Sequence, residues 1–448
     1  MKKVTLAMLI GSCITPVSSS FADTQVEQLQ QQLNQLKQDY ETRIKALEMG
    51  LKAAQIAAQK QEEEELASDD NNLQVINKNA FNPQISLILN GTYSDYQQNP
   101  DNYFIQGFPL GSEASLATKG FSLGESEITL SANIDQAFYG QLTLAFSDDG
   151  VGVEEAFAQT TALANGLTLK MGRFFSGLGY LNGQHAHAWD FADAPLIYRV
   201  LFGDQYGDDG LQISYIAPTD LFLEFGAEWF AGSSFPASGT HSGIGSWTGF
   251  TKIGGDFYQN HSWQLGLSHW QGKVATRENT GRALGFIFDG KDKINALDFV
   301  YKWSPNQSQQ RFKLQFEYFD RNEQGIINKN SIDFTPPAIA PLSGHQKGWY
   351  AQTIYHFNRQ WRVGLRYDQL ASQLRRPANI SEFNIFAPRN LISNGYHPKR
   401  YSTILEWHAS EFSRIRLQYN HDQSNPQSDN QLFLQYTFSL GTHGAHSY

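Results

Sequence analysis

Two histidines separated by one residue are the clearest candidates for metal chemistry in this chain. His185 and His187 would share a face of an extended loop, and Asp190 or Asp193 could add a carboxylate. Imidazole and carboxylate groups are ligands for a divalent metal such as zinc. Two histidines supply only half of such a site, so hydrogen bonding is the favoured role of the pair and metal binding is the alternative.

Basic side chains recur at alternate positions in three segments of the C-terminal half. Alternation places them on one face of a strand, and a cationic face inside a low-dielectric tube would concentrate anions. As an alternative, these cations would pair with Glu317, Asp368, Asp298 and Glu406 and brace the interior. The candidate substrate-binding residues are Arg311, Lys313, Arg362, Arg366, Arg414 and Arg416.

Motifs for catalysis and for cofactors are missing from the sequence. It contains no G-x-S-x-G elbow, phosphate loop, C-x-x-C pair or H-E-x-x-H motif. The net charge of −10 argues against a nucleic-acid partner. We therefore expect neither an enzyme nor a bound cofactor.

From Gln84 onward, apolar and polar residues alternate with a period of two. This period is typical of β-strands whose two faces meet different surroundings. It is clearest in the segments 311–318, 361–367 and 432–438. Sixteen such runs begin near residues 85, 124, 139, 153, 167, 208, 221, 247, 262, 294, 311, 347, 361, 401, 413 and 431.

The lengths of the links between these runs identify the class of β protein. Links after odd-numbered runs are mostly long and those after even-numbered runs are short, as in barrels with long external loops and short periplasmic turns. A soluble sandwich has no reason to keep that parity. Aromatic residues are 13% of the chain and stand at many run ends, where interfacial girdles would lie. The long links are 94–120, 174–205, 231–246, 271–293, 320–346 and 371–400.

The N-terminal segment has a different character. Residues 1–22 read as a signal peptide, and its Cys13 is the only cysteine of the chain. A lipoprotein box at Cys13 is the alternative. Residues 23–66 carry a heptad-spaced apolar seam that predicts a periplasmic α-helical coiled coil, and 67–83 read as a linker. The sequence thus predicts an all-β transmembrane protein: a sixteen-stranded antiparallel outer-membrane barrel, 84–448, preceded by this coiled coil.

Three segments carry a family resemblance: 124–127, 172–179 and 189–195. They resemble the LbtU-type siderophore porins, described for legiobactin uptake without TonB, and more distantly the phosphate-selective porins. The resemblance implies a homotrimer in contact with lipid and lipopolysaccharide, and a third loop that folds inward. The residues of that candidate constriction loop are Phe174, Phe175, Tyr180, His185, His187, Trp189 and Asp190.

Several functions remain open at this point. The resemblance implies uptake of an anionic solute, in the first place a ferric siderophore, through an open tube without a plug. An anion, phosphate or general solute porin and a zinc-linked uptake channel are alternatives. A structural or adhesive barrel is the alternative outside transport, and a lumen filled by side chains would favour it.

Overall fold

The computed structural model describes residues 83–108, 110, 115–148, 150–279, 286–305, 308–329, 338–375 and 392–441. The predicted signal peptide, coiled coil and nearly all of the linker lie outside these residues. No described helix has the length and apolar character needed to cross a membrane.

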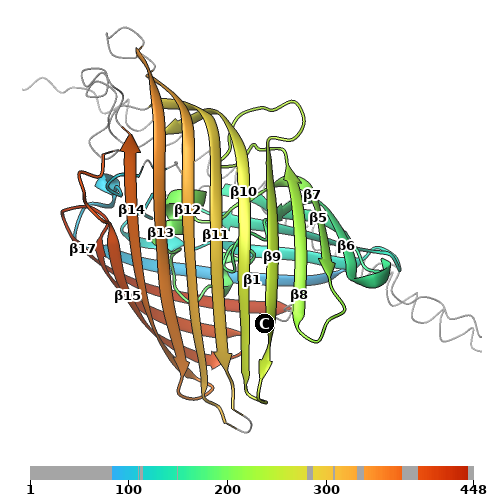
Figure 1. The fold of residues 1–448 in the computed structure, drawn as a ribbon. Helices are drawn as coiled ribbons and strands as arrows, with labels where there is room; N and C mark the ends of the chain where they lie inside the picture. The colour runs from blue at the N-terminus through green and yellow to red at the C-terminus, as the bar shows by residue number, and fades with distance from the viewer. Residues whose placement is uncertain are drawn as a thin grey trace, which may run out of the picture. The chain divides into compact units, whose positions relative to one another are not determined.

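Antiparallel strands form one closed barrel (Figure 1). The first strand, β1, pairs with the last, β17, and this pairing closes the sheet. Both β2 and β3 pair with β1, so they occupy one position in the wall and the barrel has sixteen positions. The strands are β1 (Gln84–Tyr96), β2 (Gly120–Leu123), β3 (Ser126–Asn133), β4 (Phe138–Ser147), β5 (Gly150–Thr160), β6 (Leu167–Phe175), β7 (Gly207–Ile216), β8 (Phe222–Phe230), β9 (Ser246–Phe257), β10 (His261–Asn279), β11 (Phe286–Trp303), β12 (Arg311–Lys329), β13 (Ala338–His356), β14 (Trp361–Arg375), β15 (Lys399–Ser410), β16 (Ser413–Gln423) and β17 (Asp429–Gly441). Within the described ranges, the helical segments are α2 (Leu196–Phe202) and short 3-10 turns at Pro100–Asn102, Ala164–Gly166 and Ala186–Ala188.

The two faces of the wall are reversed relative to a soluble protein. In β16 the inward side chains of Arg416, Gln418 and Asn420 are buried, whereas the outward side chains of Leu417 and Tyr419 are each 43% exposed. Exposed apolar side chains outside and polar ones inside are the pattern of a barrel surrounded by lipid. The predicted sixteen-stranded barrel is therefore confirmed.

Two of the predicted long links are wrong in extent. Strands β10 and β11 stay paired as far as Asn279 and Phe286, so the link predicted at 271–293 shrinks to 280–285. In the same way, β12 and β13 stay paired to Lys329 and Ala338, and the link predicted at 320–346 shrinks to 330–337.

The two hairpins extend further than predicted because buried ion pairs and an apolar cluster stabilise their inner face. Arg321 binds Asp292 and Glu323 at 2.6 and 3.0 Å, and Arg277 binds Glu323 at 2.6 Å, all within the barrel wall. A small apolar cluster around Phe288 packs nearby. These charged residues, which the sequence pattern assigned to loops, therefore lie in strands and point into the barrel. Their ion pairs stabilise the extension of the sheet.

Candidate functional site

The segment 176–206, between β6 and β7, crosses the interior of the barrel. Near its start, Ser176 and Gly177 hydrogen-bond Glu228 of β8. Further along, the amides of Tyr180 and Leu181 donate to the carboxylate of Glu317 in β12. Its contacts continue to β14, β15 and β16, described below. The segment, which we call the lumen loop, therefore touches strands on opposite sides of the wall.

An apolar core forms where the lumen loop meets the wall. Helix α2 lies in this loop, and its apolar side chains are at most 1% exposed. Gly203 ends the helix in the left-handed conformation (φ 65°), as is common at helix C-termini. The helix packs against Phe108 and against inward aromatic side chains of neighbouring strands, including Trp270, Phe319 and Tyr350. This part of the lumen is filled, which departs from the open tube expected above.

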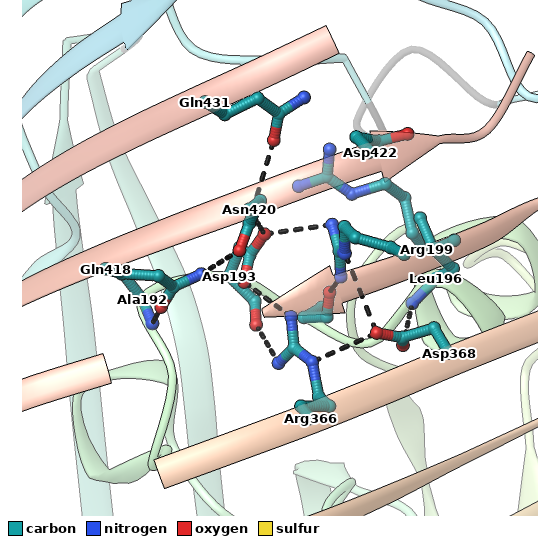
Figure 2. Close-up of polar contacts among 12 residues, drawn as sticks. Ala192, Asp193, Leu196, Arg199, Arg366, Asp368, Gln418, Asn420, Asp422 and Gln431 are labelled. Atoms are coloured by element: carbon teal, nitrogen blue, oxygen red, sulfur yellow. Dashed lines mark hydrogen bonds and ion pairs between the residues drawn. The ribbon is translucent and has the colours of Figure 1, made fainter. Parts of the chain in front are cut away.

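Two aspartates attach the middle of the loop to lumen cations. Asp190 lies 2.9 Å from both Lys313 Nζ and a guanidinium nitrogen of Arg362. Asp193 lies 2.6 Å from Arg366 and 2.9 Å from Arg400, as Figure 2 shows for the surroundings of Arg366. Burial alone would raise the pKa of each aspartate, but these cations hold both pKa values well below the ordinary range. The loop is thus tied to the wall by buried ion pairs.

The predicted substrate-binding cations fall into two groups. The first group, Arg362, Arg366 and Arg416, is buried and forms ion pairs with acids. Arg362 and Arg416 both pair with Glu406, and Arg366 pairs with Asp368. Of the four acids expected as partners, Glu317 instead accepts loop amides, and Asp298 makes no hydrogen bond within the described residues.

The remaining cations stay closer to solvent. Arg311 begins β12 and is exposed, and Lys313 is partly buried beside Asp190. Arg414 donates a hydrogen bond to the carbonyl of His187. Arg400 was missed from the sequence because it precedes the start assigned to its run, residue 401. That any of these cations contacts a solute stays a prediction.

A small cavity lies on the side of the lumen loop that faces the turn between β15 and β16. Its volume is about 240 Å³. Arg362, Arg414, His187 and His408 line it together with Glu411. Cationic and neutral donors thus outnumber the acid here, which suits a small anion.

The residues predicted to constrict the pore all lie in or beside the lumen loop. Phe174 is fully buried against Phe230, and Trp189 is 6% exposed in the apolar core. Tyr180 and Phe175 are only partly buried. Their role in selecting a solute stays a prediction.

The two histidines meet different acids from those expected. Asp190 and Asp193 turn toward the lumen arginines, whose positive charge attracts them. His185 instead lies 2.9 Å from Glu154 and 3.0 Å from Glu155 of β5, and His187 lies 2.7 Å from Glu127 of β3. Burial alone would lower the pKa of His185, but the neighbouring glutamates raise it well above the ordinary value. The carboxylates beside the two histidines are therefore those of Glu127, Glu154 and Glu155 and not those of the two aspartates, and metal binding by the histidines stays a prediction.

Comparison with known proteins supports this architecture. No family model matches the chain. Over 395 residues it is 30% identical to an uncharacterised protein of Aquifex aeolicus (strain VF5), an alignment that covers 82% of this chain and 80% of that protein. The chain belongs to the same family as this Aquifex protein.

Solved structures show the fold of this family member. A loop-deletion mutant of OmpT, an outer membrane protein of Vibrio cholerae, superposes with a TM-score of 0.51 at 10% identity, over 81% of this chain and all of that chain. The outer membrane channel DcaP of Acinetobacter baumannii gives 0.49 at 11% identity, over 80% of this chain and 97% of that chain. The first superposition agrees with the fold of an outer-membrane β-barrel.

Asn182 holds together the two ends of the lumen loop in this barrel. Its amide nitrogen donates to the carbonyls of Ser176 and Tyr206 at 2.8 Å, and its oxygen accepts from the Tyr206 amide at 2.8 Å. Asn182→Leu would remove the partner of the Ser176 carbonyl and of the Tyr206 amide, while the Tyr206 carbonyl would keep its bond from the Ser176 amide, and we expect a cost of about 1–3 kcal/mol. Faster hydrogen exchange of the Tyr206 amide would report it. Asn322→Leu, which alters an exposed asparagine, should leave that amide unchanged.

Proposed function

We propose that the protein is an outer-membrane channel for small anionic solutes, in which the lumen loop forms the constriction. The observation that carries the proposal is the loop itself, which crosses a sixteen-position barrel and is attached by ion pairs to inward arginines. A barrel of this size leaves room for a lumen, and a loop across it decides what can pass.

The surroundings follow from the same architecture. The outward apolar side chains would contact lipid and lipopolysaccharide in the bacterial outer membrane. For the rest of the chain we retain the sequence-based division into signal peptide 1–22, periplasmic coiled coil 23–66, linker 67–83 and barrel 84–448. A heptad seam cannot bury itself in a single helix, so it supports self-association, and we propose a homotrimer.

The chemistry of the cavity supports an anion as the solute. Arg414 is the cation best placed to meet it, because this guanidinium lines the cavity and donates to the neutral carbonyl of His187. Within this class we propose a ferric polycarboxylate siderophore, on the resemblance to LbtU-type porins. Phosphate and other small anions are the competing solutes.

Single-channel recording in planar bilayers tests the proposal. We expect anion-selective conductance of the folded protein and its block by a ferric polycarboxylate siderophore. Block by phosphate alone would exclude the siderophore but keep the anion channel.

Arg414→Gln tests the cationic cavity. We expect the anion-to-cation permeability ratio to fall about fivefold, which corresponds to the roughly 1 kcal/mol between unit charges 4 Å apart in water. Arg359→Gln removes an exposed charge from the turn between β13 and β14 and serves as the matched control. An unchanged ratio in Arg414→Gln would contradict the assignment of this cavity.

A structural barrel is the second candidate, and the apolar core around α2 favours it. Packing of Trp270, Phe319 and Tyr350 against the loop fills lumen space that a wide pore would leave to water. Folded protein that never conducts would support this candidate and reject the channel.

A further inference from the structure

His185 projects from the lumen loop between two acidic positions of the barrel wall. Its Nδ1 atom lies 2.9 Å from Glu154 Oε2 and 3.2 Å from Glu127 Oε2. One possible ligand atom from each of the three residues falls within 4.8 Å of the others. Three donors of metal-binding type, from two strands and one loop, thus surround a single point.

Two further side chains orient the candidate ligands His185 and Glu127, as hydrogen-bond partners of metal ligands do. The other ring nitrogen of His185, Nε2, lies 3.0 Å from Glu155 Oε2. A histidine that binds a metal through one nitrogen usually donates its other N–H to a carboxylate, which fixes the ring. In addition, His187 Nδ1 lies 2.7 Å from the second oxygen of Glu127 and so orients that carboxylate.

The charge balance of this cluster differs from that of the rest of the lumen. Asp190, Asp193 and Glu406 each have an arginine or lysine partner. Across the described ranges, no lysine or arginine ion pair reaches Glu127, Glu154 or Glu155. Glu127 is 1% exposed, Glu154 9% and Glu155 10%. Three such carboxylates are costly to bury together, and the cationic groups beside them are the two imidazoles, with Lys170 acting on Glu155.

We propose that His185 Nδ1, Glu127 and Glu154 bind a divalent cation of the zinc class. Ligands about 2.1 Å from a tetrahedral ion lie about 3.4 Å apart, so His185 Nδ1 needs to move only a few tenths of an ångström away from each of the two carboxylates. One imidazole with two carboxylates suits zinc or a similar transition ion better than calcium, which takes six to eight oxygen ligands. Water would complete the coordination, since the His185 side chain is 20% exposed.

Such an ion would join the lumen loop to strands β3 and β5. The aspartates attach the loop to β12, β14 and β15, so the ion would anchor the loop on the other side of its path. This inference goes beyond the proposed channel function and does not depend on it, because a structural barrel could use the same anchor.

Calorimetric titration with zinc chloride tests the site. The probe is zinc alone, added to the folded full-length protein after a chelator has removed bound metal. We expect one zinc ion per chain at this site, and His185→Gln should abolish that binding. Glu155→Gln should weaken it about 10- to 100-fold, the usual effect of losing a carboxylate that orients a ligating histidine.

The control is a histidine–carboxylate pair elsewhere on the barrel. His345 lies 2.7 Å from Asp320 and, among the residues that the structure describes, belongs to no three-ligand group, so His345→Gln should bind zinc as the unaltered protein does. His443 and His446 are present in every variant, so weak binding there cancels in the comparison.

The proposal is overturned if the unaltered protein binds no zinc, or if folded His185→Gln binds it with unchanged affinity. Should His185→Gln fail to fold, Glu155→Gln decides: weakened binding supports the site and unchanged affinity rejects it.

Discussion

Replacing Asp193 by alanine is expected to loosen the attachment of the lumen loop to β14, β15 and β16, although backbone carbonyls of the loop would still accept from Arg366 and Arg400. The side chain of Asp193 is 8% exposed and accepts from Arg366, Arg400 and Asn420. Its loss leaves Arg366 and Arg400, at most 1% exposed, with Asp368 as their shared acid. Removing one partner of a buried ion pair typically costs about 3–5 kcal/mol.

The local consequence distinguishes release of the loop from general instability. The base of the loop keeps its bonds to Glu228 and Asn182, and Asp190 keeps its ion pairs, so we expect the barrel to stay closed while the loop around position 193 becomes more mobile. Single-channel conductance should rise, and protease should cleave folded Asp193→Ala within 183–195.

A matched aspartate on the outside of the wall provides the control. Asp209 binds Arg173 at 2.8 Å, and the two side chains are 56% and 41% exposed. Such a pair contributes about 0–1 kcal/mol, so Asp209→Ala should change neither conductance nor cleavage. Wild-type conductance and protease resistance in Asp193→Ala would show that this ion pair does not hold the loop.

The sequence predicts the wall well because strand alternation is a local signal. In β16, the hydropathy of each residue relative to neighbours one or two positions away indicates whether its side chain points to the lumen or outward. The strand starts at Ser413, as predicted. The hairpin ends at Asn279 and Lys329 were missed because polar residues there occupy both faces of the strand, as Arg321, Asn322 and Glu323 do, so hydropathy does not alternate.

The interior could not be predicted in the same way. Asp193 and Arg366 are 173 positions apart, and no local pattern relates them. Likewise, His187 and Glu127 are 60 positions apart. Only the barrel register and the path of the loop bring these groups together. A signal was present in the acidic pairs at 125–127 and 154–155, but the partner strand of each could be identified only from the register.

The cost of placing a charge on the outer surface should depend on its height along the barrel. Leu365 in β14 is 59% exposed, four positions after Trp361 at the strand start. A transmembrane strand crosses the bilayer with about 9–11 residues, which places Leu365 near the midplane. Leu365→Arg should therefore lower the free energy of unfolding from lipid vesicles by about 2–4 kcal/mol.

Ile326 in β12 supplies the comparison at a different height. It is 49% exposed and also points outward, but it lies fifteen positions after Arg311, beyond the length needed to cross the bilayer. Ile326→Arg should cost only about 0–1 kcal/mol, because water surrounds the projecting part of the β12–β13 hairpin. Urea unfolding of both variants in vesicles gives the difference. An equal decrease in the free energy of unfolding for the two variants would mean that the bilayer does not lie at the level of Leu365. It would also contradict the placement of the long hairpins in water.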